Sequence, residues 1–148
     1  MIWFLVFQLH TSTSWANEIQ GQWKTIDDKS GFPRAIITIQ KEQDSQKYYG
    51  KIDKIYSLPN GINPIFDKCA VCKGDLKNKP IIGLKILYNF SENPKNPNEF
   101  INGEVVDPAN GNIYKGKIKI NSTGRKMTLR GYIGSSVFGR SQIWIKVD

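Results

Sequence analysis

The chain has 148 residues, a length that suits one domain with its own hydrophobic core. Lysine and arginine (21) outnumber aspartate and glutamate (13), so the formal net charge is +8 at pH 7. No apolar run reaches the roughly 20 residues of a transmembrane helix, and no transmembrane segment is expected.

Residues 1–16 are predicted to be a signal peptide. The apolar run Ile2–Phe7 is followed by Ser14-Trp15-Ala16, which places small residues at the usual cleavage spacing. No Lys or Arg precedes the run, and the alternative is an apolar first strand or core segment. We expect the mature domain to comprise residues 17–148 and to be periplasmic or secreted.

Alternation of apolar and polar residues with a period of two recurs along the rest of the chain, and helical periodicity is hard to find. The alternation predicts eight strands, at 21–27, 34–41, 46–56, 80–90, 98–106, 111–120, 125–133 and 138–147. Links rich in Gly, Pro, Asn and Asp separate most of them at hairpin length. This pattern predicts an all-β fold, an eight-stranded antiparallel up-and-down β-barrel of a size that can hold one small ligand.

The more apolar face of each strand is expected to point into the barrel. In the fourth strand this face comprises Ile82, Leu84, Ile86, Tyr88 and Phe90, and Tyr48 and Tyr114 lie on the corresponding faces of the third and sixth strands. These aliphatic walls with a few hydroxyl groups suit a partly apolar ligand. The same side chains could instead fill a small barrel and leave no cavity.

The last strand allows two orientations. Hydropathy favours Ser141, Ile143, Ile145 and Val147 inward, whereas barrel closure favours Arg140, Gln142, Trp144 and Lys146. We adopt the second, because the last strand then ends beside Trp23 and Lys146 can cover the indole through a cation–π contact. This choice buries the guanidinium of Arg140 near the open end, where it requires a carboxylate, a carbonyl or an anionic ligand as its partner.

Residues 57–79 form the longest irregular stretch and contain the only two cysteines, Cys69 and Cys72. In an oxidising compartment the pair is expected to form a local disulfide that stiffens a loop over the barrel mouth. A redox-active pair and a metal site are weaker alternatives. Zinc would need further ligands, and the only histidine, His10, lies in the predicted signal peptide. We therefore expect no metal site.

Catalytic patterns are poorly represented. Without a histidine in residues 17–148 there is no Ser-His or Cys-His dyad, and no glycine-rich phosphate loop joins a strand to a helix. We therefore expect no enzymatic activity and no cofactor. We also expect no nucleic-acid partner, because the aromatic residues fall on apolar faces and do not alternate with lysines on an exposed face.

Several motifs resemble those of an uncharacterised family of exported bacterial proteins, domain of unknown function 2147, which is regarded as lipocalin-like within the calycin group. They follow one another along nearly all of residues 17–148, and they are Gly21-Gln22-Trp23-Lys24-Thr25-Ile26-Asp27-Asp28, Pro33-Arg34, Tyr49-Gly50-Lys51-Ile52, Cys69-Ala70-Val71-Cys72-Lys73-Gly74, Asn78-Lys79-Pro80-Ile81-Ile82-Gly83-Leu84, Asp107-Pro108 with Gly111 and Tyr114, and Arg130-Gly131-Tyr132-Ile133-Gly134 with Gly139-Arg140-Ser141-Gln142-Ile143-Trp144. The resemblance implies an eight-stranded barrel with a ligand cavity, closed at one end by Trp23 and Lys146. It implies no catalytic mechanism and no known ligand.

The sequence thus predicts an exported protein that binds a small amphipathic or anionic ligand inside the barrel. Arg140 and Gln142 are expected to orient the polar end of the ligand, and Tyr48, Tyr88, Tyr114 and Trp144 to line the walls. One alternative is an envelope interaction protein with a solid barrel whose basic outer face binds anionic surfaces. Another is a thiol-redox protein that uses the Cys-x-x-Cys pair.

Overall fold

The computed structural model describes residues 18–61, 67–135, 137 and 139–148. The predicted signal peptide, with its cleavage point before Asn17, lies outside these residues. Within them, no helix is long and apolar enough to cross a membrane.

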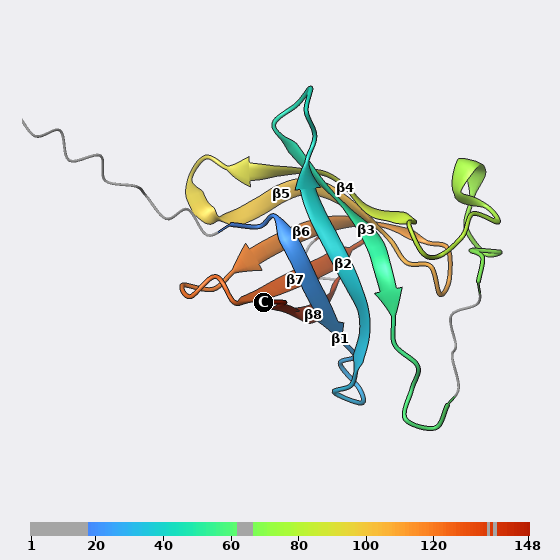
Figure 1. Ribbon diagram of the computed structural model, residues 1–148. Coiled ribbons are helices and arrows are strands. Elements are labelled where there is room, and N and C mark those ends of the chain that lie inside the picture. Colours follow the sequence, from blue (N-terminus) through green and yellow to red (C-terminus); the bar gives the residue numbers. More distant parts are fainter. Residues whose placement is uncertain (1–17, 62–66, 136, 138) are drawn as a thin grey trace, which may run out of the picture.

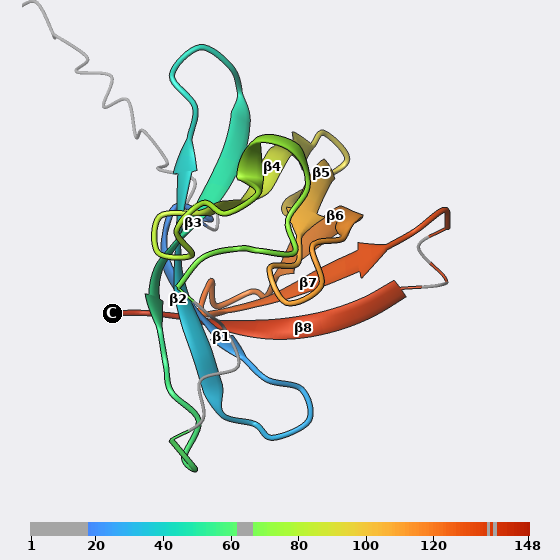
Figure 2. The ribbon, with the colours of Figure 1, turned by 90° about the vertical axis from the view of Figure 1, so that its right-hand side faces the viewer.

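Eight antiparallel strands close into a barrel in which each strand pairs with its neighbours in sequence, and β8 pairs with β1 (Figures 1 and 2). The predicted all-β up-and-down barrel is therefore confirmed. The strands are β1 (Gly21–Ile26), β2 (Pro33–Lys41), β3 (Lys47–Ile55), β4 (Lys85–Asn93), β5 (Asn96–Val106), β6 (Ile113–Ile120), β7 (Lys126–Tyr132) and β8 (Gly139–Lys146). A single turn of 3₁₀ helix, η1 (Gly74–Leu76), interrupts the long connection between β3 and β4.

The start of β4 differs from the predicted strand 80–90. Leu84 N donates to Ile81 O across a turn in which Gly83 has φ +88°, a conformation that favours glycine, and Ile82 is 54% exposed. The strand therefore begins only at Lys85. The expectation that Ile82 points into the barrel is wrong, because a turn occupies the place of the first predicted residues.

Two irregularities in β4 also shift the phase of its side chains. Gly50 pairs with Leu87 while Lys51 pairs with Lys85, and Asn89 has φ +59°. Each irregularity adds one residue and changes which face the following side chains occupy. Leu87 is consequently buried, at 1% exposure, and after the second irregularity Phe90, also 1% exposed, lies on the inward face as predicted.

The closed half of the barrel is the end that contains the termini of the described chain, the β2–β3, β4–β5 and β6–β7 turns, and the side chains between them. It is filled by large apolar residues with little or no exposure: Trp23, Ile39, Phe90, Phe100, Ile118, Ile120 and Met127. The ring of Phe90 lies against the backbones of Gly103 and Gly116, where an added Cβ would come within 2.4 Å and 2.6 Å of ring atoms. These two glycines make room for the phenylalanine, so this half has the density of an ordinary core.

Trp23 and Lys146 lie opposite each other in the pairing of β1 with β8. The Nζ atom of Lys146 is 4.7 Å from the centroid of the Trp23 ring, and Trp23 Nε1 donates to Ile19 O at 2.8 Å. Lys146 Nζ also donates to the carbonyls of Glu18 and Gln20. Gly21 has φ +117°, and an added Cβ would lie 3.0 Å from Lys146 Nζ, so the Gly-x-Trp motif leaves space for the lysine that covers the indole.

In β8 the side chains of Gln142 and Trp144 face the barrel interior, whereas Ile143 and Ile145 are 40% and 38% exposed. This is the orientation that barrel closure predicted and that hydropathy alone did not. The pairing of Trp23 with Lys146 fixes the phase of the strand, since alternate residues share one face.

Candidate functional site: a cavity at the open end of the barrel

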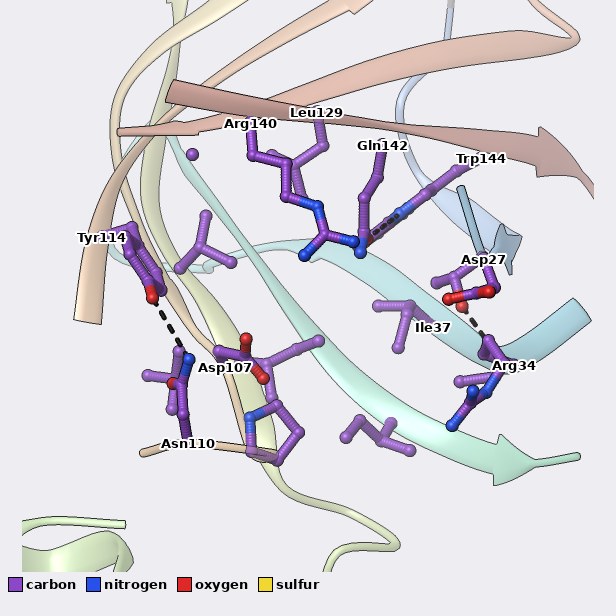
Figure 3. Close-up of a pocket in the computed structure, with 18 of the residues that line it drawn as sticks. Asp27, Arg34, Ile37, Asp107, Asn110, Tyr114, Leu129, Arg140, Gln142 and Trp144 are labelled. Carbon is purple, nitrogen blue, oxygen red and sulfur yellow. Dashed lines mark hydrogen bonds between the residues drawn. The ribbon is translucent and has the colours of Figure 1, made fainter. Parts of the chain in front are cut away.

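The open half of the barrel encloses a cavity of about 530 Å³ (Figure 3). Its walls are mainly aliphatic, with Ala35, Ile37, Ile52, Ile86, Val105 and Leu129 among them, and all eight strands contribute lining residues. The volume lies within the range of roughly 300–1,000 Å³ that is usual for small-molecule sites. The barrel is thus solid in one half and hollow in the other, contrary to the solid barrel of the alternative prediction.

Trp144 and Gln142 form the polar part of the β8 wall. Trp144 is 2% exposed, and its Nε1 donates to Gln142 Oε1 at 3.3 Å, as the dashed line in Figure 3 shows. Because the indole N–H can only donate, Gln142 must turn its carbonyl oxygen toward it. The NH₂ group of Gln142 is left as a donor for a ligand.

Tyr114 and Thr25 add two hydroxyl groups to the lining. Tyr114 Oη accepts hydrogen bonds from Asn110 Nδ2 at 3.2 Å and from Asn112 Nδ2 at 3.4 Å. Thr25 Oγ1 accepts from the backbone N–H of Ala35 at 3.1 Å. Since both oxygens already accept, their O–H hydrogens are the groups that remain for a ligand.

Four charged residues line the cavity opening, Asp27, Arg34, Asp107 and Arg140, and Asp28 pairs with Arg140; we call these five the rim charges. Arg140 donates from Nε to Asp28 Oδ2 at 2.9 Å and makes a second bond from Nη2 to Asp28 Oδ1. Its side chain is 60% exposed, so the expectation of a buried guanidinium at position 140 is wrong. The partner is a carboxylate of the β1–β2 loop, close to the end of β1, which is the neighbour of β8 in the closed barrel.

Hydrogen bonds perturb the ionisation of this pair. The bond from Arg140 holds the pKa of the Asp28 carboxyl below its ordinary value, and Asp28 raises the pKa of Arg140. Both effects favour the charged forms. Arg140 therefore shapes the rim through a bidentate ion pair, and its fork of donors is largely occupied by Asp28.

Asp27 and Asp107 stabilise the loops that carry them. Asp27 Oδ2 accepts from Ser30 N at 2.8 Å and Ser30 Oγ at 2.7 Å, and these bonds lower the pKa of Asp27. Asp107 Oδ1 accepts from Ala109 N at 2.9 Å. Both residues line the cavity opening, and each carboxylate has a structural role in a turn.

Arg34 is a lining residue that the alternation of β2 does not reveal, because Ala35, Ile37 and Ile39 form the inward face. The pairing of β1 with β2 shifts between Thr25 and Ile26, so that Ile26 pairs with Pro33. At this irregular end of the strand Arg34 lies beside Asp27 at the cavity opening (Figure 3). The Pro33-Arg34 motif was the only sequence signal at this position.

Tyr48 and Tyr88 do not line the cavity, contrary to expectation. Tyr48 belongs to the closed half, where it meets Phe100 edge to face at 5.3 Å and donates to Glu92 Oε1 at 2.9 Å. Burial, reinforced by Glu92, raises the pKa of Tyr48 to about 12. Tyr88 pairs across from the exposed Glu104, and Lys85 Nζ lies 4.8 Å from its ring on the outer face, because the irregularities in β4 reverse its orientation.

Cys69 and Cys72 form a disulfide, as predicted, and both are buried. The described part of the connection between β3 and β4 packs against the β5–β6 turn: Cys69 Sγ lies 3.8 Å from Pro108 O, and a Cβ on Gly111 would collide with Val71 O. In residues 57–61 and 67–79 no side chain lines the cavity. This segment supports one side of the rim from outside, and residues 62–66 lie outside the description.

Lys115, Lys117 and Lys119 are exposed on the outer face of β6, but two of them lie opposite Glu104 and Glu99 of β5. Among the described residues no group of His, Cys, Asp and Glu side chains could hold a metal ion.

Comparison with known proteins agrees with this geometry. The family model described as an uncharacterised protein conserved in bacteria, DUF2147, matches residues 21–146. The solved structure of protein HP1028 from Helicobacter pylori, whose title assigns it to the lipocalin family, superposes with a TM-score of 0.71 at 15% identity and covers 88% of this chain and 84% of its own. No curated protein matches the chain. The fold is thus lipocalin-like, and the chain belongs to the DUF2147 family of bacterial proteins.

Proposed function

We propose that this protein binds one small, partly apolar molecule in the cavity at the open end of the barrel. The observation that carries the proposal is the division of the barrel into a filled half and a hollow half. Phe90 and its neighbours pack the closed half, while an aliphatic cavity of about 530 Å³ remains above them. A lipocalin-like fold is compatible with such a role.

The polar groups of the lining indicate what the ligand must offer. Thr25, Tyr114 and Gln142 present hydrogen-bond donors, because their oxygen atoms already accept bonds from protein groups. A ligand with hydrogen-bond acceptors at one end and an apolar remainder complements this arrangement. We assign the protein a binding role and no catalysis.

We further propose that the protein acts after export, in the periplasm or outside the cell. The predicted signal peptide and a disulfide that stiffens a loop both suit an oxidising compartment. Docking of the basic outer face on an anionic envelope surface stays a prediction, which loss of binding at high salt would test.

Titration with dodecanol tests the binding function with a neutral probe. Binding is followed through the fluorescence of Trp144, which lines the cavity, and native mass spectrometry of protein purified from its own source identifies any retained molecule. Gly131→Phe should block the site, since Gly131 lines it and an added Cβ there meets only Tyr114, at 3.5 Å. Gly131→Ala is the matched control that leaves the cavity open.

Saturable binding by the wild type and Gly131→Ala, lost in Gly131→Phe, supports the proposal. Absence of both a retained molecule and dodecanol binding contradicts it. Binding that persists in Gly131→Phe also contradicts it, because the probe would then occupy another place.

A further inference from the structure

Arg34 is the rim charge that has no protein partner among the described residues. Its Nε atom is buried without a hydrogen-bond partner, and its guanidinium takes part in none of the ion pairs of the described chain. Arg34 lines the cavity opening from the second position of β2. A buried donor on a charged group is unfavourable until an acceptor reaches it, so a ligand that supplies one is stabilised at this point.

The neighbouring carboxylates are committed elsewhere. Asp28 holds Arg140, Asp27 accepts two bonds from Ser30, and Asp107 accepts from Ala109 N. Asp27 is near enough to Arg34 for the guanidinium to contribute to its lowered pKa, but the two side chains form no ion pair. Arg140, the guanidinium that the sequence singled out, forms an ion pair with Asp28, whereas Arg34 forms none among the described residues.

The polar groups of the cavity lining also favour a ligand that carries hydrogen-bond acceptors. Elsewhere in the lining, the free groups of Thr25, Tyr114 and Gln142 are donors as well. A guanidinium binds carboxylate and phosphate oxygens in a planar, bidentate manner. The aliphatic walls beyond these groups suit the hydrocarbon part of the same ligand.

We propose that Arg34 anchors an anionic head group, a carboxylate or a phosphate, of an amphiphile whose apolar part occupies the cavity. The inference rests on the proposed binding function and adds the class of ligand and the residue that selects it. Three carboxylates outnumber two guanidinium groups among the rim charges, so selectivity depends on direct contact with Arg34 and not on the net charge of the rim.

Three probes with the same chain and different head groups test this assignment: dodecanoate, dodecyl phosphate and dodecanol. Their affinities are measured for the oxidised wild-type protein, Arg34→Gln, Arg34→Lys and Arg125→Gln. Arg125→Gln is the matched control, since it removes the same charge from the closed end, where Arg125 pairs with Asp148. Circular dichroism verifies that each variant is folded.

The wild type and Arg125→Gln should bind one of the two anions at least about tenfold more tightly than dodecanol, the range expected for hydrogen bonds to a charged group. The preferred anion identifies carboxylate or phosphate as the natural head group. In Arg34→Gln the anion and alcohol affinities should converge, and Arg34→Lys should retain an intermediate preference because it keeps the charge without the planar fork.

An anion preference that survives in Arg34→Gln, or that falls equally in Arg125→Gln, overturns the assignment. If Arg34→Gln does not fold, the test relies on Arg34→Lys. An anion preference over dodecanol equal to that of the wild type in Arg34→Lys counts against a role for the planar guanidinium. Equal affinity of the wild type for dodecanol and both anions overturns the anionic head group but leaves the binding function intact. Failure of all three probes to bind contradicts both proposals.

Discussion

Replacing Gly103 with alanine tests how the closed half of the barrel is filled. The new Cβ would lie 2.4 Å from ring atoms of Phe90, whereas nonbonded carbons prefer about 3.5–4.0 Å. The ring or β5 must therefore move by about 1 Å inside a packed core. Overpacking of this kind costs about 1–3 kcal/mol, and we expect a loss of unfolding free energy near the upper end of that range.

A double-mutant cycle with Phe90→Leu separates this collision from other effects. The shorter side chain alone should cost about 1–2 kcal/mol, and in the double variant the loss should be smaller than the sum of the single losses by at least about 1 kcal/mol. Urea unfolding, followed by tryptophan fluorescence, gives the four free energies. Gly131→Ala is the matched control, because its Cβ meets Tyr114 at an ordinary 3.5 Å, and it should change stability by less than about 0.5 kcal/mol.

The explanation is refuted if Gly103→Ala is as stable as Gly131→Ala. It is equally refuted if the losses of the two single variants simply add. Either result would mean that Phe90 and Gly103 are not in the contact that divides the barrel into a filled and a hollow half.

Three further predictions concern ionisation, the rim and the loop. Because folding raises the pKa of Tyr48 from about 10 to about 12, the unfolding free energy should fall as the pH rises from about 10 to about 12. Urea unfolding midpoints measured across that pH range should fall less steeply in Tyr48→Phe. An equally steep fall in that variant would contradict the role of Tyr48. Asp28→Asn should release Arg140 and raise dodecanoate affinity several-fold in the same titrations, whereas a lower affinity would show that Asp28 itself supports binding. Reduction of Cys69–Cys72 should lower the unfolding free energy by about 2 kcal/mol, measured with and without reductant, and equal stability would contradict a role for the disulfide.

Sequence alone predicted the features that depend on local periodicity and on chain order. Alternation along β2, β6 and β7 identified strands whose inward faces are the observed ones, and hairpin-length links predicted an up-and-down barrel. Closure of that barrel brings β8 beside β1, so the pairing of Trp23 with Lys146 followed from the order of strands. The disulfide followed from two cysteines only three positions apart.

Tertiary structure decided where that periodicity fails. The first irregularity of β4 brings Leu87 inward and turns Tyr88 outward, because one extra residue reverses the alternation that follows it, and the second returns Phe90 to its predicted inward face. The fit of Phe90 against Gly103 joins residues of different strands and sets how much of the barrel is filled. Neither effect is visible in a count of apolar positions.

The candidate site shows the same division most clearly. Sequence placed Arg140, Gln142, Trp144 and Tyr114 at the cavity because each lies on a predictable strand face. Which guanidinium is available to a ligand depends on a contact across 112 positions of the chain, the pairing of Arg140 with Asp28, for which no local pattern exists. The inward faces of β6 and β8 therefore followed from the sequence, because alternation and strand order determine them. The absence of an ion pair for Arg34 among the described residues was decided only in the tertiary structure, where the β1–β2 loop meets β8 and Asp28 pairs with Arg140.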